Sequence, residues 1–364
     1  MEKAQVQRQI EQFFNEKVDK DPKVHHALLH VHSEKHGIDI NIAAGEESIH
    51  AQQPYYIASV SKLFAAVLVG QLVEQGLCSY EDKISQYLEE DLLKDLHIYK
   101  GKDYTNEIEI KHLLNHTSGL HDFFEDQPVK GKSMPDLLVD EPNRAWTPLK
   151  VIHWAKENMK NHFPPGKGFH YSDTGYHLLG FIIEKITGLP FHEVLRTNIF
   201  EPLEMKHSHF SRTAPVEASP YEVAKLYIRN TDVTNNKSLD ILHAGGGVVS
   251  TTNDLLKFMK ALVNDQILKK ETIEQMKADC GKFFVGIDYG YGVMNIKTVP
   301  VLMPAKYNSW GNAGSTGSFM FYHPATDAYL IGTLNQFGYG PKGIRLMLQI
   351  VNMLLKAAKK SIAI

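Results

Sequence analysis

Residues 56–63 read YIASVSKL and lead into the apolar run LFAAVLVGQLVEQG at residues 63–76. The run predicts a buried helix, and the glycine that closes it is a common residue just past a helix C-terminus. Residues three apart lie on one helix face, so Ser59 and Lys62 are neighbours, whereas Ser61 and Lys62 point in different directions. We therefore expect the Lys62 amine to lie beside the Ser59 hydroxyl in the first helical turn, and Ser61 to have no chemical role.

This pairing of Ser59 with Lys62 suits nucleophilic catalysis. The free amides and the dipole of a helix N-terminus favour negative charge that develops on the serine oxygen. Burial among apolar neighbours disfavours a charged ammonium, so we expect a neutral Lys62 amine that takes the proton of the Ser59 hydroxyl. Two alternatives stay open at this point: a Ser-x-x-Lys match arises by chance, and a lysine in the first turn can extend its amine into solvent.

The remaining patterns place strands near both ends of the chain and helices in the middle. Apolar residues at helical spacing predict a helix at the N-terminus, and alternating residues around a turn at His36 and Gly37 predict a β-hairpin. Helical patterns dominate from about residue 85 to 240. Strand-like runs and a last long helix follow at residues 289–297, 317–324, 328–336 and 343–360.

This order predicts an α+β fold with two parts. We expect an antiparallel sheet, flanked by the N- and C-terminal helices, that is built from residues 1–85 and 241–364. Residues 86–240 are expected to form an inserted all-helical domain, and the active site is expected between the two parts.

Two more stretches carry residues that suit an active site. PPGKGFHYSDTGYHLLG, residues 164–180, has Tyr171 just before an expected helix start near Thr174, and a tyrosine beside a lysine can relay protons. SWGNAGSTGSFMFYHP, residues 309–324, runs from glycines into a strand whose edge can offer a backbone amide to an oxyanion. Taken alone, the first stretch is better explained by a core tyrosine in a loop. The alternative for the second stretch is a plain turn before a buried strand.

Taken together, these motifs resemble those of the serine β-lactamase and penicillin-binding-protein superfamily, in its class C-like branch of esterases and D-peptidases. The Ser-x-x-Lys at residues 59–62 matches the nucleophile motif of that superfamily. YSD at residues 171–173 resembles its Tyr-x-Asn motif, and NAG at residues 312–314 falls where the family has Lys-Thr-Gly or His-x-Gly. The order and spacing agree along about residues 24–355.

The resemblance implies a β-lactamase/transpeptidase-like fold and a serine hydrolase that works through an acyl-enzyme. Ser59 would be the acylated nucleophile, and Lys62 and Tyr171 would share the general acid and base work. The backbone amides of Ser59 and Ser315 would form the oxyanion hole, and Tyr171, alone or with Lys62, would activate the water that hydrolyses the acyl-enzyme. No cofactor or metal is expected, and the substrate would be bound by Asp173, Asn312, Ala313 and Gly314.

Two positions depart from the family pattern. Asp173 replaces an asparagine, and an ionised aspartate only accepts hydrogen bonds, so it can pair with Lys62 or attract a substrate amine. Asn312 replaces a cation that helps to hold the carboxylate of β-lactams and D-alanyl peptides in the family. Both changes weigh against a β-lactamase or D-alanyl carboxypeptidase and favour an esterase, amidase or aminopeptidase-like hydrolase of a small ester, amide or D-amino-acid-containing peptide. The alternatives are a penicillin-binding or sensor protein that is acylated slowly without turnover, and a scaffold without chemistry.

The composition limits the partners and the location. With 39 basic and 42 acidic residues, the chain shows no basic footprint for nucleic acid, so a small-molecule or short-peptide substrate fits better. No run of about 18 uncharged apolar residues occurs, so no membrane span is expected. The N-terminus lacks the apolar core of a signal peptide; we expect a cytoplasmic protein if Met1 is the natural start, and an extracellular one if the natural chain begins earlier.

Three further features are interpreted as structural. His30 and His32 lie on one face of an expected strand, as a metal pair would, but no third ligand stands at a familiar spacing, so a polar outer face is preferred. His116 and His121 flank the sequence TSGL and are interpreted as a helix end and a turn rather than as substrate contacts. The glycines at 245–247 lack the lysine of a phosphate loop, and tight backbone packing accounts for them better.

Overall fold

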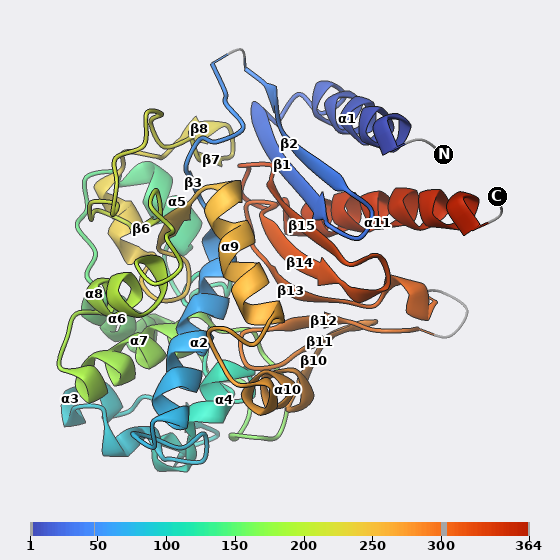
Figure 1. Cartoon of the computed structure of the whole chain (residues 1–364). Helices are drawn as coiled ribbons and strands as arrows, with labels where there is room; N and C mark the ends of the chain where they lie inside the picture. Colours follow the sequence, from blue (N-terminus) through green and yellow to red (C-terminus); the bar gives the residue numbers. More distant parts are fainter. Residues whose placement is uncertain (1–2, 47, 300–303, 363–364) are drawn as a thin grey trace.

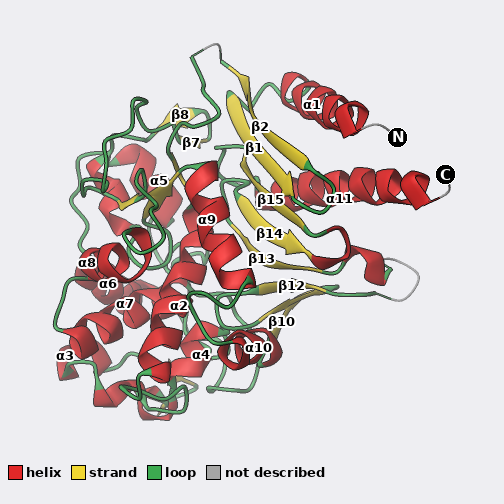
Figure 2. Cartoon of the chain, in the orientation of Figure 1, coloured by secondary structure: helices red, strands yellow, loops and turns green. Residues whose placement is uncertain are grey.

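The computed structural model describes residues 3–46, 48–299 and 304–362, and its largest element is an eight-stranded antiparallel sheet (Figures 1 and 2). The strand order is β10-β11-β12-β13-β14-β15-β1-β2, so the two N-terminal strands pair with the C-terminal ones through β15 and β1. The strands are β1 His26–Ser33, β2 Ile38–Gly45, β10 Gly281–Phe284, β11 Ile287–Tyr289, β12 Met294–Ile296, β13 Ser309–Ala313, β14 Phe319–His323 and β15 Ala328–Thr333.

Short strands form three small sheets outside the main one. The three-stranded sheet β3-β9-β6 lies beside the start of the central helix, and the other two are two-stranded hairpins. Their members are β3 Tyr55–Tyr56, β6 His209–Phe210 and β9 Val248–Ser250, then β4 Ile98–Tyr99 with β5 Lys102–Asp103, and β7 Tyr227–Ile228 with β8 Thr231–Asp232.

Helices cover both faces of the main sheet (Figure 1). The terminal helices α1 and α11 lie together on one face, and α9 lies on the other, between the sheet and the helical part of the chain. The helices are α1 Lys3–Asp19, α2 Ser61–Glu74, α3 Glu90–Leu93, α4 Ile110–Leu114, α5 Met134–Asp140, α6 Pro148–Asn158, α7 Asp173–Thr187, α8 Phe191–Leu195, α9 Thr252–Val263, α10 Lys270–Ala278 and α11 Gly340–Ile362.

Successive side chains along β1 point to opposite faces of the sheet, and so belong to different parts of the core. Leu29 and Val31 pack with the terminal helices, whereas Leu28, one residue out of phase, packs with the core around α2 and α9. Helix α2 is apolar on nearly all sides, because it is enclosed between the sheet and helices such as α7 and α8. One core cluster therefore joins the sheet to the helical part, and α2 runs through its centre.

The predicted antiparallel sheet flanked by terminal helices is confirmed, as are the N-terminal helix, the hairpin and the last helix. The predicted strand at 289–297 is wrong in its extent, because the chain turns between β11 and β12. Gly292 has φ of 67°, and a Cβ there would lie 2.5 Å from the Cβ of Ala66 on α2. The division of the chain into two domains stays a prediction, but residues 86–240 are not all-helical, because the short strands β4 to β8 lie among their helices.

Two other expectations are resolved by the fold. The interpretation of His30 as part of a polar outer face is wrong, because its side chain is 5% exposed under the α9 side of the sheet. Over the residues that the structure describes, no helix combines the length and the hydropathy needed to cross a bilayer.

Candidate active site

Ser59 lies in a 3₁₀ turn, Ala58–Val60, that runs directly into α2. Ala58 has φ of 50°, a left-handed conformation that is strained for a residue with a side chain and that is found disproportionately at functional sites. The turn puts the Ser59 amide at the start of the helix, where backbone N–H groups lack intrahelical partners. Ser59 therefore presents its hydroxyl and its amide together at the positive end of the helix dipole.

Lys62 is fully buried, and all three of its N–H donors are engaged. Its Nζ donates to Ser59 Oγ at 3.1 Å and to the Gly245 carbonyl oxygen at 2.8 Å, and it forms an ion pair with Asp173. An ammonium has three donors, so this is the arrangement of a charged lysine whose lost hydration is compensated by a carboxylate. The expectation of a neutral amine considered burial alone and left out Asp173, whose carboxylate favours the charged form.

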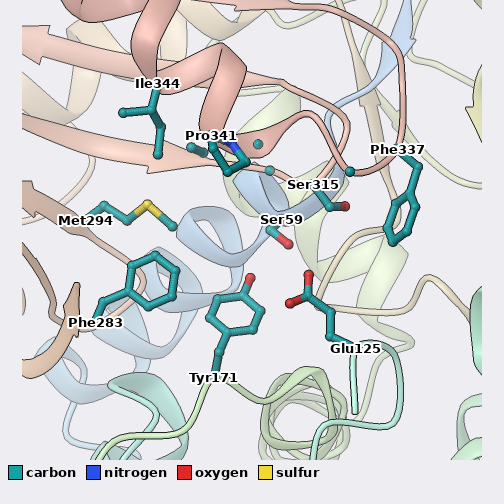
Figure 3. Close-up of a pocket in the computed structure, with 13 residues that line it drawn as sticks. Ser59, Glu125, Tyr171, Phe283, Met294, Ser315, Phe337, Pro341 and Ile344 are labelled. Atoms are coloured by element: carbon teal, nitrogen blue, oxygen red, sulfur yellow. The ribbon is translucent and has the colours of Figure 1, made fainter. Parts of the chain in front are cut away.

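Tyr171 also faces Ser59. Figure 3 shows its hydroxyl pointing toward the Ser59 hydroxyl, and the two groups are within hydrogen-bonding reach. The Lys62 Nζ lies 4.8 Å from the centre of the Tyr171 ring. Burial, followed by the effects of Tyr289 and Asp173, raises the pKa of Tyr171 well above 10. Tyr171 is therefore a neutral phenol at neutral pH, which is a proton donor.

His116 holds the segment that carries Tyr171. Its Nδ1 accepts a hydrogen bond from the Ser172 amide at 3.0 Å, and its carbonyl oxygen accepts one from the His170 amide at 2.9 Å. Its ring centre lies 4.2 Å from that of Tyr171. Burial, and then the charge of Lys62, lowers the pKa of His116 well below 6.5, so the ring is neutral and Nδ1 can accept. His116 is thus a positioning residue, in keeping with the structural interpretation of the sequence.

The end of β13 lies against the turn that carries Ser59. A Cβ placed on Gly314 would be 2.9 Å from the Cβ of Ala58 and 3.0 Å from the Ser59 nitrogen. Only a glycine allows this close approach, which brings Ala313, Gly314 and Ser315 to the site. Ser59 and Ser315, the two residues predicted to supply oxyanion amides, line the same pocket.

Asn312 is the predicted site residue that the fold keeps away from the pocket. It is fully buried, and its Nδ2 donates to Tyr289 Oη at 3.1 Å and to the Gly292 carbonyl oxygen at 2.7 Å. Its Oδ1 accepts from the Ala313 amide at 2.7 Å. The expected contact between Asn312 and substrate is therefore not supported, because side chains alternate along β13 and this one points into the core.

Gly245 and Ser61, to which the sequence assigned no chemical role, lie beside the site. A Cβ on Gly245 would lie 2.5 Å from Asp173 Oδ1, so this glycine gives Lys62 and Asp173 the room to pair. Ser61 Oγ accepts a hydrogen bond from the Val248 amide at 3.1 Å, which ties α2 to β9. Ser61 faces away from Lys62, as the helix geometry predicts.

Carboxyl groups gather beside Lys62. Asp173 is the first residue of α7, where the helix dipole favours a negative charge. Asp122 is buried, and its Oδ1 accepts hydrogen bonds from the amides of Phe124 and Asp173 at 3.0 and 3.2 Å. Burial, then Asp173 and Glu125, raises the pKa of Asp122 well above 3.8. The nearby Glu125 completes a group of three carboxyls around one lysine.

A pocket of about 320 Å³ opens over Ser59 (Figure 3). Its walls are mostly apolar, and Glu125 points its carboxylate into the pocket from the edge. Desolvation in this concave site, and then the Asp173 carboxylate, raises the pKa of Glu125 above 4.5. The lining residues, none of which carries a cationic side chain, are Ser59, Glu125, Tyr171, Phe283, Met294, Ala313, Gly314, Ser315, Phe337, Gly338, Gly340, Pro341 and Ile344.

Sequence reasoning missed Glu125 and the apolar wall. Glu125 lies in a loop without periodic pattern, and Phe283 and Ile344 come from β10 and α11, far along the chain. The sequence gives no signal that these residues meet. The predicted residues Ser59, Lys62, Tyr171 and Asp173 do meet, around one serine hydroxyl.

The fold and this serine site define a class of penicillin-recognising serine enzymes and their relatives. A family model described as Beta-lactamase matches residues 33–351, and the chain belongs to this family. The resemblance inferred from the motifs is therefore confirmed.

Individual relatives agree with this assignment. Penicillin-binding protein 4* of Bacillus subtilis is 30% identical over 258 residues, which cover 65% of this chain and 51% of that protein. The chain thus spans about half the length of the curated relatives that it matches.

Solved structures share the fold along nearly the whole chain. A D-stereospecific amidohydrolase from Streptomyces sp. aligns with a TM-score of 0.77 and 23% identity, covering 95% of this chain and 98% of its own. A D-amino acid amidase from Ochrobactrum anthropi SV3 aligns with a TM-score of 0.75 and 24% identity, covering 98% of this chain and 99% of its own. At these identities the likeness establishes the fold.

Proposed function

We propose that this β-lactamase-fold protein is a serine amidase or esterase that is acylated on Ser59 and prefers small substrates whose acyl part carries a free amino group. The proposal rests above all on the position of Glu125, an acidic side chain that points into an otherwise mostly apolar pocket beside Ser59.

In the acylation step, Ser59 Oγ attacks the carbonyl carbon of the substrate. Lys62 passes one ammonium proton to the Asp173 carboxylate and accepts the proton of the Ser59 hydroxyl as the Oγ–C bond forms. Negative charge develops on the carbonyl oxygen, where the amides of Ser59 and Ser315 would stabilise it. The neutral phenol of Tyr171 then protonates the leaving nitrogen or oxygen as its bond to the carbonyl carbon breaks.

Deacylation reverses these roles with water as the nucleophile. The Tyr171 phenolate left by the first step takes a proton from water, and the resulting hydroxide attacks the ester carbonyl. The bond to Ser59 Oγ breaks, the proton held by Lys62 returns to the serine, and Asp173 gives its proton back to Lys62. The phenol, the ion pair and the free hydroxyl are all restored, so the cycle needs no cofactor.

The charge of the site supports the preference for an amine. Glu125 and Asp173 both lie near the ammonium of Lys62, and repulsion by Asp173 contributes to the raised pKa of Glu125. An ammonium group on the substrate would relieve this repulsion and pair with Glu125. A substrate carboxylate would meet no cation among the lining residues, which weighs against β-lactams and D-alanyl peptides.

The names of structural relatives fit the same substrate class. A D-amino acid amidase and a D-stereospecific amidohydrolase share the fold, and both names describe the hydrolysis of amides with D stereochemistry. For this chain we propose D-amino-acid amides and esters with an apolar side chain, because Phe283, Phe337 and Ile344 provide an apolar wall. The pocket volume suits one such residue.

Matched substrates test the proposal. The purified protein is assayed with D- and L-phenylalanine amide and with the p-nitrophenyl ester of D-phenylalanine, each with a free and an acetylated amino group. The expected result is a higher kcat/KM for the free amines, and loss of that preference in Glu125→Gln with the acetylated substrates little affected. Equal rates for both forms would overturn the amine preference. A persistent acyl adduct by intact-mass spectrometry, with no turnover, would instead identify a slowly acylated binding protein.

A further inference from the structure

The hairpin β1–β2 brings together His30, His32 and Asp39 on the face that α9 partly covers. His30 and His32 are two apart on β1, so their side chains point to the same side of the sheet. Asp39 on β2 pairs directly with His32 in the antiparallel register. Asp39 is thus a third ligand group, which the sequence did not indicate, and it comes from the other strand of the hairpin.

The three side chains converge on one point. Asp39 Oδ1 lies 3.0 Å from His30 Nε2 and 3.1 Å from His32 Nδ1, and the three ligand atoms all lie within 4.8 Å of one another. Metal–nitrogen and metal–oxygen bonds of about 2.0–2.1 Å in tetrahedral geometry separate ligand atoms by about 3.3 Å. Small outward movements of these side chains would therefore admit an ion.

The orientations of the rings also favour a metal. The two imidazole planes cross at 86° with centres 6.2 Å apart, so their nitrogens approach the carboxylate from different directions. A second cluster offers a contrast: His162 and His170 both contact Asp126, but their rings are stacked with centres 3.5 Å apart and planes at 27°. Stacked rings lie side by side against the carboxylate, whereas the crossed rings of His30 and His32 are arranged around it.

The surroundings complete the ligand environment. His30 and His32 side chains are 5% and 16% exposed, whereas Asp39 is 68% exposed, so the site is anchored on its inner side and open to solvent on the other. The second nitrogen of His32 lies 3.6 Å from Glu34 Oε1, and Lys260 on α9 holds that carboxylate at 2.6 Å. A carboxylate behind a ligand histidine is a common means of fixing its orientation.

From this geometry we infer that the hairpin binds a divalent transition metal of the Zn²⁺ type through His30 Nε2, His32 Nδ1 and Asp39 Oδ1. Two imidazoles and one carboxylate are a donor set that Zn²⁺ takes in proteins, with a fourth position left for water. The strands β14 and β15 separate β1 from β13, which carries Gly314 beside Ser59. The ion would cross-link β1 and β2 and stabilise the fold rather than act on the substrate.

Zn²⁺ titration of the chelator-treated full chain tests the inference, with calorimetry for affinity and thermal unfolding for stability. Wild-type protein is expected to bind one Zn²⁺ at the hairpin and to gain Tm. His32→Ala and Asp39→Asn are each expected to weaken binding by at least about tenfold and to remove the gain in Tm. His36→Ala, in the turn of the same hairpin, is the matched control and should bind as wild type does.

Two results would overturn the inference. One is unchanged Zn²⁺ affinity in both His32→Ala and Asp39→Asn, and the other is the absence of saturable binding in the wild type. A His162→Ala/His170→Ala variant assigns any second ion to the stacked cluster. Because the Asp39 side chain is largely exposed, circular dichroism of metal-free Asp39→Asn is expected to match the wild type, so loss of binding in that variant is separable from unfolding.

Discussion

The Ser59 pocket and the His30–His32–Asp39 cluster differ in how the chain assembles them. The cluster comes from one hairpin, whose register places its members together. The pocket takes residues from the start of α2, the loops at 125 and 171, the end of β13 and the start of α11. A local site depends on one pairing of strands, whereas the pocket depends on the packing of the whole molecule.

The two sites also handle charge differently. At the hairpin, a largely exposed carboxylate faces two histidines, and water can solvate it. At Lys62, an ion pair lies in the core, where each partner needs the other because water is excluded. Substitutions at the pocket should therefore change both chemistry and stability, whereas those at the hairpin should change metal binding and only the stability that the metal adds.

The largest effect is expected at the nucleophile. Ser59→Ala should reduce turnover by several orders of magnitude and abolish labelling by a serine-reactive phosphonate, because the attacking oxygen is lost. Ser61→Ala is the matched control two residues on, and it should keep labelling and most of the turnover. Labelling that survives in Ser59→Ala and disappears in Ser61→Ala would refute the assignment of the nucleophile.

Breaking the buried ion pair should be the largest change in stability. Asp173→Asn leaves the fully buried Lys62 without its carboxylate, which is expected to lower the free energy of unfolding by about 3–5 kcal/mol in urea titrations. The exposed pair Lys185–Glu89 is the control, and Glu89→Gln should cost far less because water solvates both partners. Equal losses in the two variants would contradict the proposed dependence on burial.

A smaller effect is expected from Glu125. Removing its charge should reduce the preference for free-amine over acetylated substrates by about ten- to hundredfold, the contribution of one charged hydrogen bond. Because desolvation and Asp173 raise the pKa of Glu125, its carboxylate is lost on acidification at a higher pH than usual. The preference for free-amine substrates should therefore fall as the pH drops through the raised pKa of Glu125. The substrate amines stay protonated over this range, so the change reports the loss of the Glu125 charge.

Glu125→Gln should flatten that pH dependence, whereas Glu157→Gln, an exposed substitution on α6, should leave it unchanged. The measurement is kcat/KM for one matched pair of substrates across the pH range. A wild-type preference that is constant with pH would show that Glu125 does not bind the amine.

The smallest effect is expected at the hairpin. Asp39→Asn, with or without Zn²⁺, should leave kcat/KM at the wild-type value, because β14 and β15 lie between β1 and the strand that reaches Ser59. A metal-dependent change in turnover would show that the two sites are coupled, and the contrast between them would have to be abandoned.

Much of this protein is determined by local sequence. Helical spacing selects Ser59 over Ser61 as the partner of Lys62, and apolar periodicity gives the terminal helices and the hairpin, because these depend on neighbours within a few residues. The motifs around Ser59, Tyr171 and Gly314 also indicate the family, whose fold then follows.

Only the tertiary structure decided the rest. It paired Lys62 with Asp173, turned Asn312 into the core, brought Glu125 to the pocket and set Asp39 opposite His32. The physical reason is that charge compensation and pocket lining depend on groups from distant segments, which spacing along one helix or strand does not encode. Ser59 and Lys62 were thus predictable as neighbours, but the pairing of the lysine with Asp173 was not.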